Sequence, residues 1–322
     1  MRIYLLVLQD VFDTGLAALL DTFSIANALA KSTGISSVPF TVRTVAVRTR
    51  VTTGHGLVIP TQHATRLAPP DVVIVPAISA MSPQTLQIAL ERRDIADAQA
   101  ILLRWSQKGT LVGAACTGTL VLAGTSLLKG RPATTTWWLS PFFRARYPDV
   151  VLDESRMIVS SPGIVTGGAA LAHFDLALWL VRRTSPALAS LTARYLVVEP
   201  RPSQAAFIIP DQLAHTDPLV ERFEQWARSR LDKGFSLREA AHETGTSART
   251  LARRLHSVVG RSPLGYFQDL RIERAVHLLQ TSDSSLEQIA AQVGYENGVS
   301  LRALIRRKIG CGVREIRTRH CQ

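Results

Sequence analysis

An internal repeat in the last third of the chain restricts its fold more than any other sequence feature. The run S-L-R-E-A-A at residues 236–241 recurs 49 residues later as S-L-E-Q-I-A at 285–290. Each copy begins with a serine that is followed three residues later by Glu239 or Gln288, a pattern that predicts a capping box at a helix start. Each copy then reaches a glycine, Gly245 or Gly294, where a turn between helices needs a left-handed backbone. The repeat therefore predicts two copies of one helical motif.

A second predicted helix follows the turn in each copy and ends at another glycine. Leu251 and Leu255 of the first copy correspond, 50 residues on, to Leu301 and Ile305 of the second, so each helix has an apolar face. Residues 262–279 between the copies predict one long helix, which would hold the two motifs about one DNA turn (~34–36 Å) apart. A helix, a glycine turn and a basic second helix are the signature of a helix-turn-helix unit.

The second helix of each unit carries the predicted DNA contacts. Arg249 and Arg253 are four residues apart, on the face opposite to the leucines, and arginine can donate two hydrogen bonds to guanine in the major groove. The other residues are placed to contact bases or phosphates. The full predicted set is Ser247, Arg249, Thr250, Arg253 and Arg254 in the first unit, and Asn297, Val299, Ser300, Arg302, Arg306 and Arg307 in the second.

The charge distribution agrees with a polyanionic partner. The formal net charge is +12, and the residues from Thr216 onward hold half of it, with 18 Lys/Arg against 12 Asp/Glu. Such an excess favours nucleic acid or an anionic membrane surface. A plain helical bundle with solvated arginines is the alternative, but it does not require matched caps and matched glycines in both copies.

The first part of the chain alternates short apolar, β-branched runs with helical patterns. This order predicts an α/β fold, a doubly wound, flavodoxin-like, mostly parallel sheet covered by helices on both faces. The predicted strands are residues 3–8, 40–47, 72–75, 111–114, 157–159 and 164–165, and residues 51–61 predict a small hairpin beside the sheet. Prolines interrupt the region that follows. The predicted domains are a sensing and dimerisation domain at 1–185, a linker at 186–215, and an all-α DNA-binding domain with two helix-turn-helix units at 216–322.

One strand of this sheet runs into a cysteine. In residues 111–119 an apolar strand is followed by small residues, Cys116 and a predicted helix, which is the shape of a nucleophile elbow. A catalytic cysteine usually needs a histidine as a base, and His173, in an apolar helix, reads as a buried structural residue. The alternative is a ligand pocket at the carboxyl ends of the strands, with Cys116 and Thr117 as its floor and Trp137 on its wall.

Several classes of protein do not fit this sequence. The three cysteines are too few and too scattered for a disulfide framework or a zinc site, so we expect no metal, no cofactor and a reducing cytoplasm. The apolar run at the N-terminus is interrupted by Gln9 and Asp10 and predicts a strand rather than a signal peptide. Residues 164–181 contain His173 and Asp175, which favours a buried helix over a membrane span.

Residues 235–318 resemble the DNA-binding domain of the AraC/XylS family. The run I-A-A-Q-V-G-Y-E-N at 289–297 resembles the family signature, and S-A-R-T-L-A-R-R-L at 247–255 resembles its first recognition helix. Three residues depart from the family pattern: Ala303 stands at a usual base-contacting arginine, Ile305 at a phenylalanine and Val313 at a proline. The first two departures imply that the second unit reads DNA less strictly and relies on backbone contacts.

Residues 1–183 resemble the ThiJ/PfpI-like, class I glutamine amidotransferase-like domain, through the elbow and the run R-P-A-T-T-T-W at 131–137. Together with the AraC-type domain, this is the arrangement of the GlxA-type regulators. Thr136 stands where the pattern often has a histidine that would assist the cysteine. The resemblance therefore implies a regulator rather than an enzyme, with an effector of unknown identity at Cys116, Thr117, Thr136 and Trp137.

The same resemblance implies a cytoplasmic homodimer, associated with the nucleoid when it binds double-stranded promoter DNA, with RNA polymerase as a candidate partner. A cysteine-dependent hydrolase or amidase with an accessory nucleic-acid-binding module is the alternative function. An architectural DNA binder without a sensor is a third.

Overall fold

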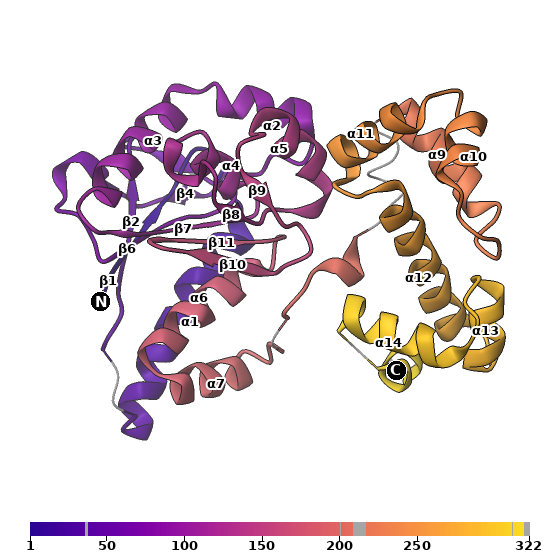
Figure 1. Cartoon of the computed structure of the whole chain (residues 1–322). Helices are drawn as coiled ribbons and strands as arrows, with labels where there is room; N and C mark the ends of the chain where they lie inside the picture. The colour runs from indigo at the N-terminus through magenta and orange to yellow at the C-terminus, as the bar shows by residue number, and fades with distance from the viewer. Residues whose placement is uncertain (36–37, 200, 209–216, 311, 319–322) are drawn as a thin grey trace. The chain divides into compact units, whose positions relative to one another are not determined.

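The chain folds as two compact units, Met1–Gln204 and Ala205–Gln322. The computed structural model describes residues 1–35, 38–199, 201–208, 217–310 and 312–318 (Figure 1). The predicted linker at 186–215 begins with helix α7 (Pro186–Tyr195), which starts at a capping serine, Ser185, and packs on two helices of the first unit. Helix α7 therefore belongs to the first unit. Residues 200 and 209–215 of the predicted linker lie outside the described part of the chain.

A seven-stranded sheet forms the centre of the first unit, in the order β10-β11-β7-β6-β1-β2-β5. All neighbouring strands are parallel except β10, which runs antiparallel to β11 at one edge. The sheet confirms the predicted doubly wound α/β fold. Its strands are β1 (Arg2–Leu6), β2 (Thr41–Ala46), β5 (Gln62–His63), β6 (Val72–Val75), β7 (Leu111–Ala115), β10 (Ile158–Ser161) and β11 (Ile164–Gly167).

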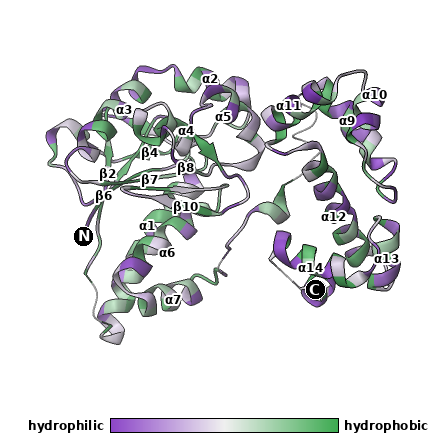
Figure 2. Cartoon of the chain, in the orientation of Figure 1, coloured by the Kyte–Doolittle hydropathy of each residue, from purple (hydrophilic) through white to green (hydrophobic). Residues whose placement is uncertain are grey.

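Helices cover both faces of the sheet because alternate residues of each strand point to opposite sides. In β1, Ile3 and Leu5 join one buried cluster, and Tyr4 and Leu6 join the other. Helices on one face are α1 (Asp13–Thr33), α6 (Ala172–Thr184) and α7, and those on the other are α2 (Pro83–Leu90), α3 (Arg93–Ser106), α4 (Gly118–Ala123) and α5 (Ser140–Arg146) (Figure 1). Figure 2 shows the apolar colouring concentrated in the strands between these two layers.

Two small strand pairs lie outside the main sheet. The predicted hairpin is confirmed as β3 (Val51–Thr52) and β4 (Val58–Ile59), which pair antiparallel. The second pair, β8 (Pro132–Ala133) and β9 (Val151–Leu152), is parallel. The hairpin begins just after β2 ends, so it brings its residues to the carboxyl edge of the sheet.

The second unit is helical, as predicted. Its α-helices are α9 (Pro218–Arg228), α10 (Leu237–Glu243), α11 (Ala248–Val259), α12 (Pro263–Thr281), α13 (Leu286–Gln292), α14 (Gly298–Ile309) and α15 (Val313–Thr318). The pairs α10–α11 and α13–α14 are the two copies of the repeat, and α12 is the single long helix expected between them. Within the described ranges of the chain, no helix is both long and apolar enough to cross a bilayer.

Candidate functional sites: two helix-turn-helix units and a cysteine elbow

The first helix of each unit is capped by the serine that the repeat predicts. Ser285 accepts a hydrogen bond from the Gln288 amide at 3.2 Å, and the Gln288 side chain accepts one from the Ser285 amide at 2.8 Å, which completes the capping box of α13. Ser236 likewise accepts from the Glu239 amide at 3.3 Å. The predicted return bond from Glu239 is absent from the described contacts, because its carboxylate pairs with Arg230 instead.

The turn and the second helix also begin as predicted. Gly245 and Gly294 have φ values of +69° and +73°, the left-handed conformation that the turn requires. Ser247 then caps α11 by accepting from the Thr250 amide at 3.1 Å. Asn297 caps α14 by accepting from the Ser300 amide at 2.9 Å. Two residues of the predicted DNA-binding set, Ser247 and Asn297, therefore hold the start of each recognition helix.

Arg271 on α12 contacts both the segment between α9 and α10 and the turn of the second helix-turn-helix unit, and it is not among the predicted site residues. Its guanidinium donates to the Leu231 carbonyl at 2.8 Å and the Lys233 carbonyl at 2.5 Å, and it lies 5.3 Å from the centre of the Tyr295 ring. A Cβ at Gly294 would lie 2.6 Å from the Leu231 carbonyl oxygen, so this glycine is needed for close packing as well as for its turn. These contacts hold the segment between α9 and α10 against the turn between α13 and α14.

The first recognition helix, α11, exposes two of its arginines and engages the third. Arg249 and Arg253 are exposed, while Leu251 and Leu255 are fully buried on the opposite face. Arg254 forms an ion pair with Asp217 at 2.5 Å. Asp217 is 4% exposed and caps α9, so part of the positive charge of Arg254 is already neutralised within the unit.

The second recognition helix, α14, presents a mixed surface. Arg302, Arg306 and Arg307 are exposed on its polar side, and Val299, which is 72% exposed, lies in its first turn. Lys308 pairs with Asp269 of α12 and is tied to the scaffold. The exposed face therefore offers three arginines and one aliphatic side chain near the helix start. That these residues and those of α11 contact DNA stays a prediction.

In the N-terminal unit, Met1–Gln204, Cys116 lies at the sharp turn between β7 and α4. Its φ of +54° is the left-handed conformation of a nucleophile elbow. The turn requires Gly118, because a Cβ there would lie 2.4 Å from the Val75 carbonyl oxygen and 2.7 Å from that of Pro76. The expected elbow is present in shape, and its chemistry depends on the surroundings of the thiol.

Those surroundings keep the Cys116 thiol protonated. The residue is 4% exposed, and burial raises the pKa of the thiol to about 11, against hydrogen bonds with Thr117 and Thr136 that lower it. The thiolate is the nucleophilic form of cysteine. Thr136, which stands where a histidine would assist, is fully buried and cannot act as a general base. The thiol therefore lacks the activation that a catalytic cysteine needs.

The backbone amides beside the elbow already have partners. The Ala77 amide donates to His173 Nε2 at 3.1 Å, and the Ile78 amide donates to Thr117 Oγ1 at 2.8 Å. Both amides follow β6, at the same carboxyl edge of the sheet as Cys116. Because their hydrogens are engaged by side chains, neither is available to stabilise an oxyanion at this edge.

All four predicted effector contacts are buried. Thr117, Thr136 and Trp137 are 2%, 0% and 7% exposed, like Cys116. Two further hydroxyls in this region, those of Thr119 on α4 and Ser140 on α5, are buried and have no hydrogen-bond partner within the described part of the chain. A buried unpaired hydroxyl costs about 1–3 kcal/mol. This region therefore holds polar groups that internal contacts do not satisfy.

The three histidines of the N-terminal unit lie in different surroundings. His173 is buried and bonded at both ring nitrogens, so its structural interpretation is confirmed. His55 is exposed and pairs with Asp13 at 2.9 Å, and His63 bonds to Thr65 beside β5. None of these three side chains contacts the Cys116 thiol through a hydrogen bond among the described residues.

Comparisons with known proteins agree with both units. A helix-turn-helix domain family matches residues 240–319. The HTH-type transcriptional regulator CdhR of Pseudomonas aeruginosa is 26% identical over 205 residues, 61% of this chain and 60% of that regulator. The HTH-type transcriptional regulator GlxA of Rhizobium meliloti is 26% identical over 215 residues, 64% of this chain and 66% of that protein. The chain thus covers slightly less than two thirds of either relative.

Two solved structures share the fold of the first unit. An AraC family transcriptional regulator from Pseudomonas putida is 16% identical with a TM-score of 0.50, over 61% of this chain and 98% of that one. A ThiJ/PfpI family protein from Pseudomonas syringae is 21% identical with a TM-score of 0.50, over 62% of this chain and 76% of that one.

Proposed function

We propose that this chain, whose C-terminal unit is an AraC-type helix-turn-helix domain and whose N-terminal unit has the ThiJ/PfpI-like fold, is a transcriptional regulator that binds promoter DNA sequence-specifically. The observation that carries this proposal is the pair of capped helix-turn-helix units, each of which exposes arginines on its second helix. Double-stranded DNA matches such a pair because successive major grooves recur on one face of the duplex.

The two recognition helices have different roles in DNA binding. Arg249 and Arg253 of α11 read bases, because arginine can bind guanine bidentately in the major groove. Arg302, Arg306 and Arg307 of α14 contact mainly phosphates, which give affinity without sequence information. The remaining predicted contacts support this division: the caps Ser247 and Asn297 direct free helix amides at phosphates, Thr250 and Ser300 add hydroxyl donors, and Val299 offers an apolar contact to a thymine methyl group.

Arg254 contributes less to DNA binding than its neighbours in this proposal. Its ion pair with Asp217 at 2.5 Å competes with a phosphate for the same guanidinium. The side chain is nevertheless half exposed, so it adds a screened phosphate contact at the edge of the interface.

The N-terminal unit binds a small-molecule effector near Cys116, with Thr117, Thr136 and Trp137 as further contacts. The unpaired buried hydroxyls of Thr119 and Ser140 support a polar guest in this region. Because the four contact residues are buried, effector binding requires that the side chains covering them move. Binding would thereby favour one conformation of the N-terminal unit over another, and this change in population is how the effector regulates the protein. Assembly as a homodimer through this unit, contact with RNA polymerase and a cytoplasmic, nucleoid-associated location belong to the same proposal.

A cysteine-dependent hydrolase or amidase is the second candidate, because the backbone at Cys116 has the geometry of a nucleophile elbow. The raised pKa of the thiol and the engaged amides of Ala77 and Ile78 argue against it. Cys116→Ala separates the two functions. DNA binding should survive the substitution in both cases, and any ester or amide hydrolysis that disappears with it would establish the enzyme.

A genome-wide map of binding in the native host tests the regulator directly. We expect sharp peaks upstream of few operons for the native chain. The same map for the double variant Arg249→Ala/Arg253→Ala should lose these peaks, whereas Arg238→Ala, an exposed arginine of α10 outside the recognition helix, should keep them. A flat map from soluble, well-expressed native protein would overturn the proposal.

A further inference from the structure

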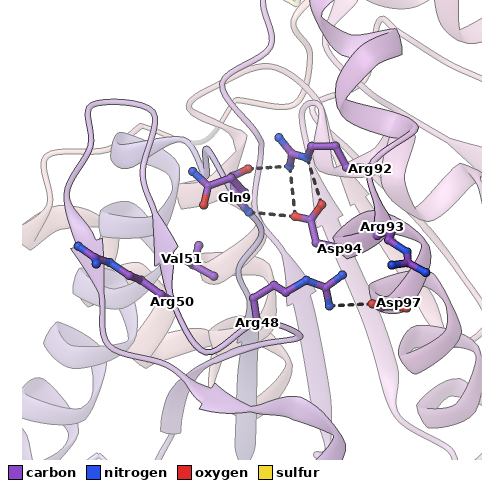
Figure 3. Close-up of a pocket in the computed structure, with 8 residues that line it drawn as sticks. All are labelled: Gln9, Arg48, Arg50, Val51, Arg92, Arg93, Asp94 and Asp97. Carbon is purple, nitrogen blue, oxygen red and sulfur yellow. Dashed lines mark hydrogen bonds and ion pairs between the residues drawn. The ribbon is translucent and has the colours of Figure 1, made fainter.

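A second candidate site lies in the first unit, at the carboxyl ends of β1 and β2 beside the start of α3. It is a pocket of about 750 Å³, within the range of small-molecule sites. Four arginines and only two carboxylates line it (Figure 3). The lining residues are Gln9, Arg48, Arg50, Val51, Arg92, Arg93, Asp94 and Asp97.

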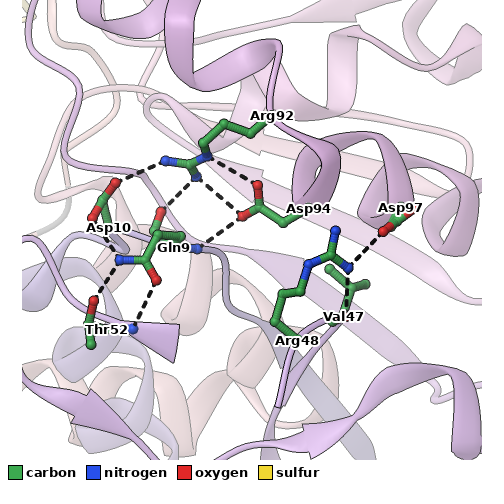
Figure 4. Close-up of polar contacts among 8 residues, drawn as sticks. All are labelled: Gln9, Asp10, Val47, Arg48, Thr52, Arg92, Asp94 and Asp97. Carbon is green, nitrogen blue, oxygen red and sulfur yellow. Dashed lines mark hydrogen bonds and ion pairs between the residues drawn. The ribbon is translucent and has the colours of Figure 1, made fainter. Parts of the chain in front are cut away.

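Arg92 and Asp94 build a fixed floor for this pocket. The Arg92 guanidinium donates to Asp94 at 3.1 Å, to Asp10 at 2.9 Å and to the Gln9 carbonyl at 2.8 Å, and the Gln9 amide donates to Asp94 at 3.2 Å (Figure 4). Asp94 is buried, so its charge is neutralised inside this network. One guanidinium faces two carboxylates here, so the floor holds the walls in position but carries an excess of one negative charge.

The remaining carboxylate, that of Asp97, is also engaged. Arg48 donates to it at 2.7 Å through Nη1, which also contacts the Val47 carbonyl at 2.9 Å. The other nitrogens of Arg48 have no partner among the residues that the structure describes, nor do the exposed guanidinium groups of Arg50 and Arg93. Figure 3 shows Arg50 and Arg93 on opposite sides of the pocket with Arg48 between them. With Asp10 included, four guanidinium groups face three carboxylates, so the pocket keeps an excess of one positive charge.

The position of the pocket in the fold favours a ligand. β1 pairs with β2 on one side and with β6 on the other, so the chain changes direction across the sheet at β1. In open α/β sheets, ligands bind outside the carboxyl ends of the strands at such a switch point, here between β1 and β6, and the pocket begins beside it at the carboxyl end of β1. Arg93 and Asp94 are the first residues of α3, whose N-terminal amides favour negative charge.

We propose that this pocket binds a small metabolite through its oxyanion group, a carboxylate or a phosphate, held by Arg48, Arg50 and Arg93. Arginine suits both groups because its planar fork matches two oxygens at once. The site differs from the effector region at Cys116 in its residues and in its exposure. It does not depend on DNA binding, so its test and that of the proposed function are independent.

Calorimetric titration of the full chain tests the site, with sodium succinate and sodium phosphate as separate probes and sodium chloride at equal ionic strength as the reference. The informative variant is Arg50→Gln/Arg93→Gln, which removes two exposed side chains from the pocket and leaves its floor intact. The matched control is Arg66→Gln/Arg104→Gln, which removes the same charge at exposed positions of the first unit outside the pocket.

We expect saturable binding of at least one probe, weakened at least about tenfold in Arg50→Gln/Arg93→Gln and unchanged in the control. Binding of succinate alone assigns a carboxylate ligand, and binding of phosphate alone assigns a phosphorylated one. Heat that follows ionic strength without saturation, or an equal loss in both double variants, would overturn the proposal.

Discussion

The backbone amide of Ala77 donates a hydrogen bond to Nε2 of His173, at 3.1 Å. Nδ1 of the same ring lies 2.6 Å from the Ala170 carbonyl, so the neutral ring carries its proton on Nδ1. The bond ties the loop after β6 to α6, across 96 residues of sequence. It also engages an amide at the same carboxyl edge of the sheet as Cys116, so this amide cannot donate to an oxyanion there.

The first prediction concerns pH. Burial lowers the pKa of His173 to about 4, from 6.5 in the unfolded chain. Between these values the unfolded chain binds the proton and the folded chain does not, so stability falls as the pH decreases from 6.5 to 4. The difference corresponds to up to about 3 kcal/mol in the free energy of unfolding. Urea unfolding of the native chain across this pH range measures the slope.

His173→Gln should flatten that slope, because glutamine offers an oxygen to the Ala77 amide and does not titrate. His242→Gln is the matched control, since the side chain of His242 is 86% exposed and solvent surrounds it. Equal slopes in the native chain and in His173→Gln would show that other groups cause the pH dependence.

The second prediction concerns Cys116. With a pKa of about 11, about one thiol in a thousand is ionised at pH 8, and its burial blocks access as well. Iodoacetamide should therefore leave Cys116 unmodified in the folded chain and alkylate it after unfolding in urea. Peptide mapping by mass spectrometry reads the modification at this cysteine. Rapid alkylation in the folded chain would restore the hypothesis of a reactive thiol.

The third prediction tests the packing of the elbow. Gly118→Ala places a Cβ 2.4 Å from a backbone oxygen that cannot move without displacing β6, and overpacking of this kind costs about 1–3 kcal/mol or more. Gly113→Ala in β7 is the control, because its Cβ meets the Ile74 side chain at 3.4 Å, an ordinary contact. Thermal unfolding should show a large loss for Gly118→Ala and a small effect for Gly113→Ala; similar losses would contradict the geometry.

The fourth prediction separates base reading from phosphate contact. Arg249→Ala should lose about 1–3 kcal/mol of discrimination between operator and random DNA, because a base contact disappears. Arg302→Ala should weaken binding to both DNAs alike and reduce the salt dependence by about one phosphate contact. Fluorescence anisotropy over a range of salt concentrations measures both quantities. Equal loss of discrimination in the two variants would contradict the proposed division between α11 and α14.

The fifth prediction concerns the pair Asp217 and Arg254. Asp217 accepts from the Leu219 and Val220 amides at the start of α9, so Asp217→Ala should destabilise the C-terminal unit by about 0.5–2 kcal/mol. Once Asp217 is gone, Arg254 is free to contact phosphate, and DNA affinity at low salt should rise slightly. Unfolding and DNA titration of the same variant check both parts. A stable variant with weaker DNA binding would show that Asp217 orients Arg254 for the duplex.

The sequence predicted well what is decided within a few residues of chain. Ser247 and Asn297 cap their helices, and Gly245 and Gly294 adopt left-handed turns, because these conformations depend on neighbouring backbone groups. The alternation of apolar strands with helices predicted the parallel sheet for a different reason, because parallel strands need a crossover connection, which is usually a helix. The elbow at Cys116 also followed from its local run of small residues.

Only the tertiary structure decided which charged and polar groups remain available. Arg254 is engaged by Asp217 and Lys308 by Asp269, each partner more than thirty residues away, so sequence spacing could not rank the basic residues of α11 and α14. The high pKa of Cys116 and the engaged amide of Ala77 depend on burial and on a distant histidine. The arginine pocket gathers three separate segments, because parallel strands bring their carboxyl ends to one edge regardless of sequence distance. The sequence alone therefore determined the local conformation of caps and turns. The tertiary structure decided which arginines form ion pairs, the pKa of the Cys116 thiol and which residues line the pocket, because each of these depends on which groups lie together in space.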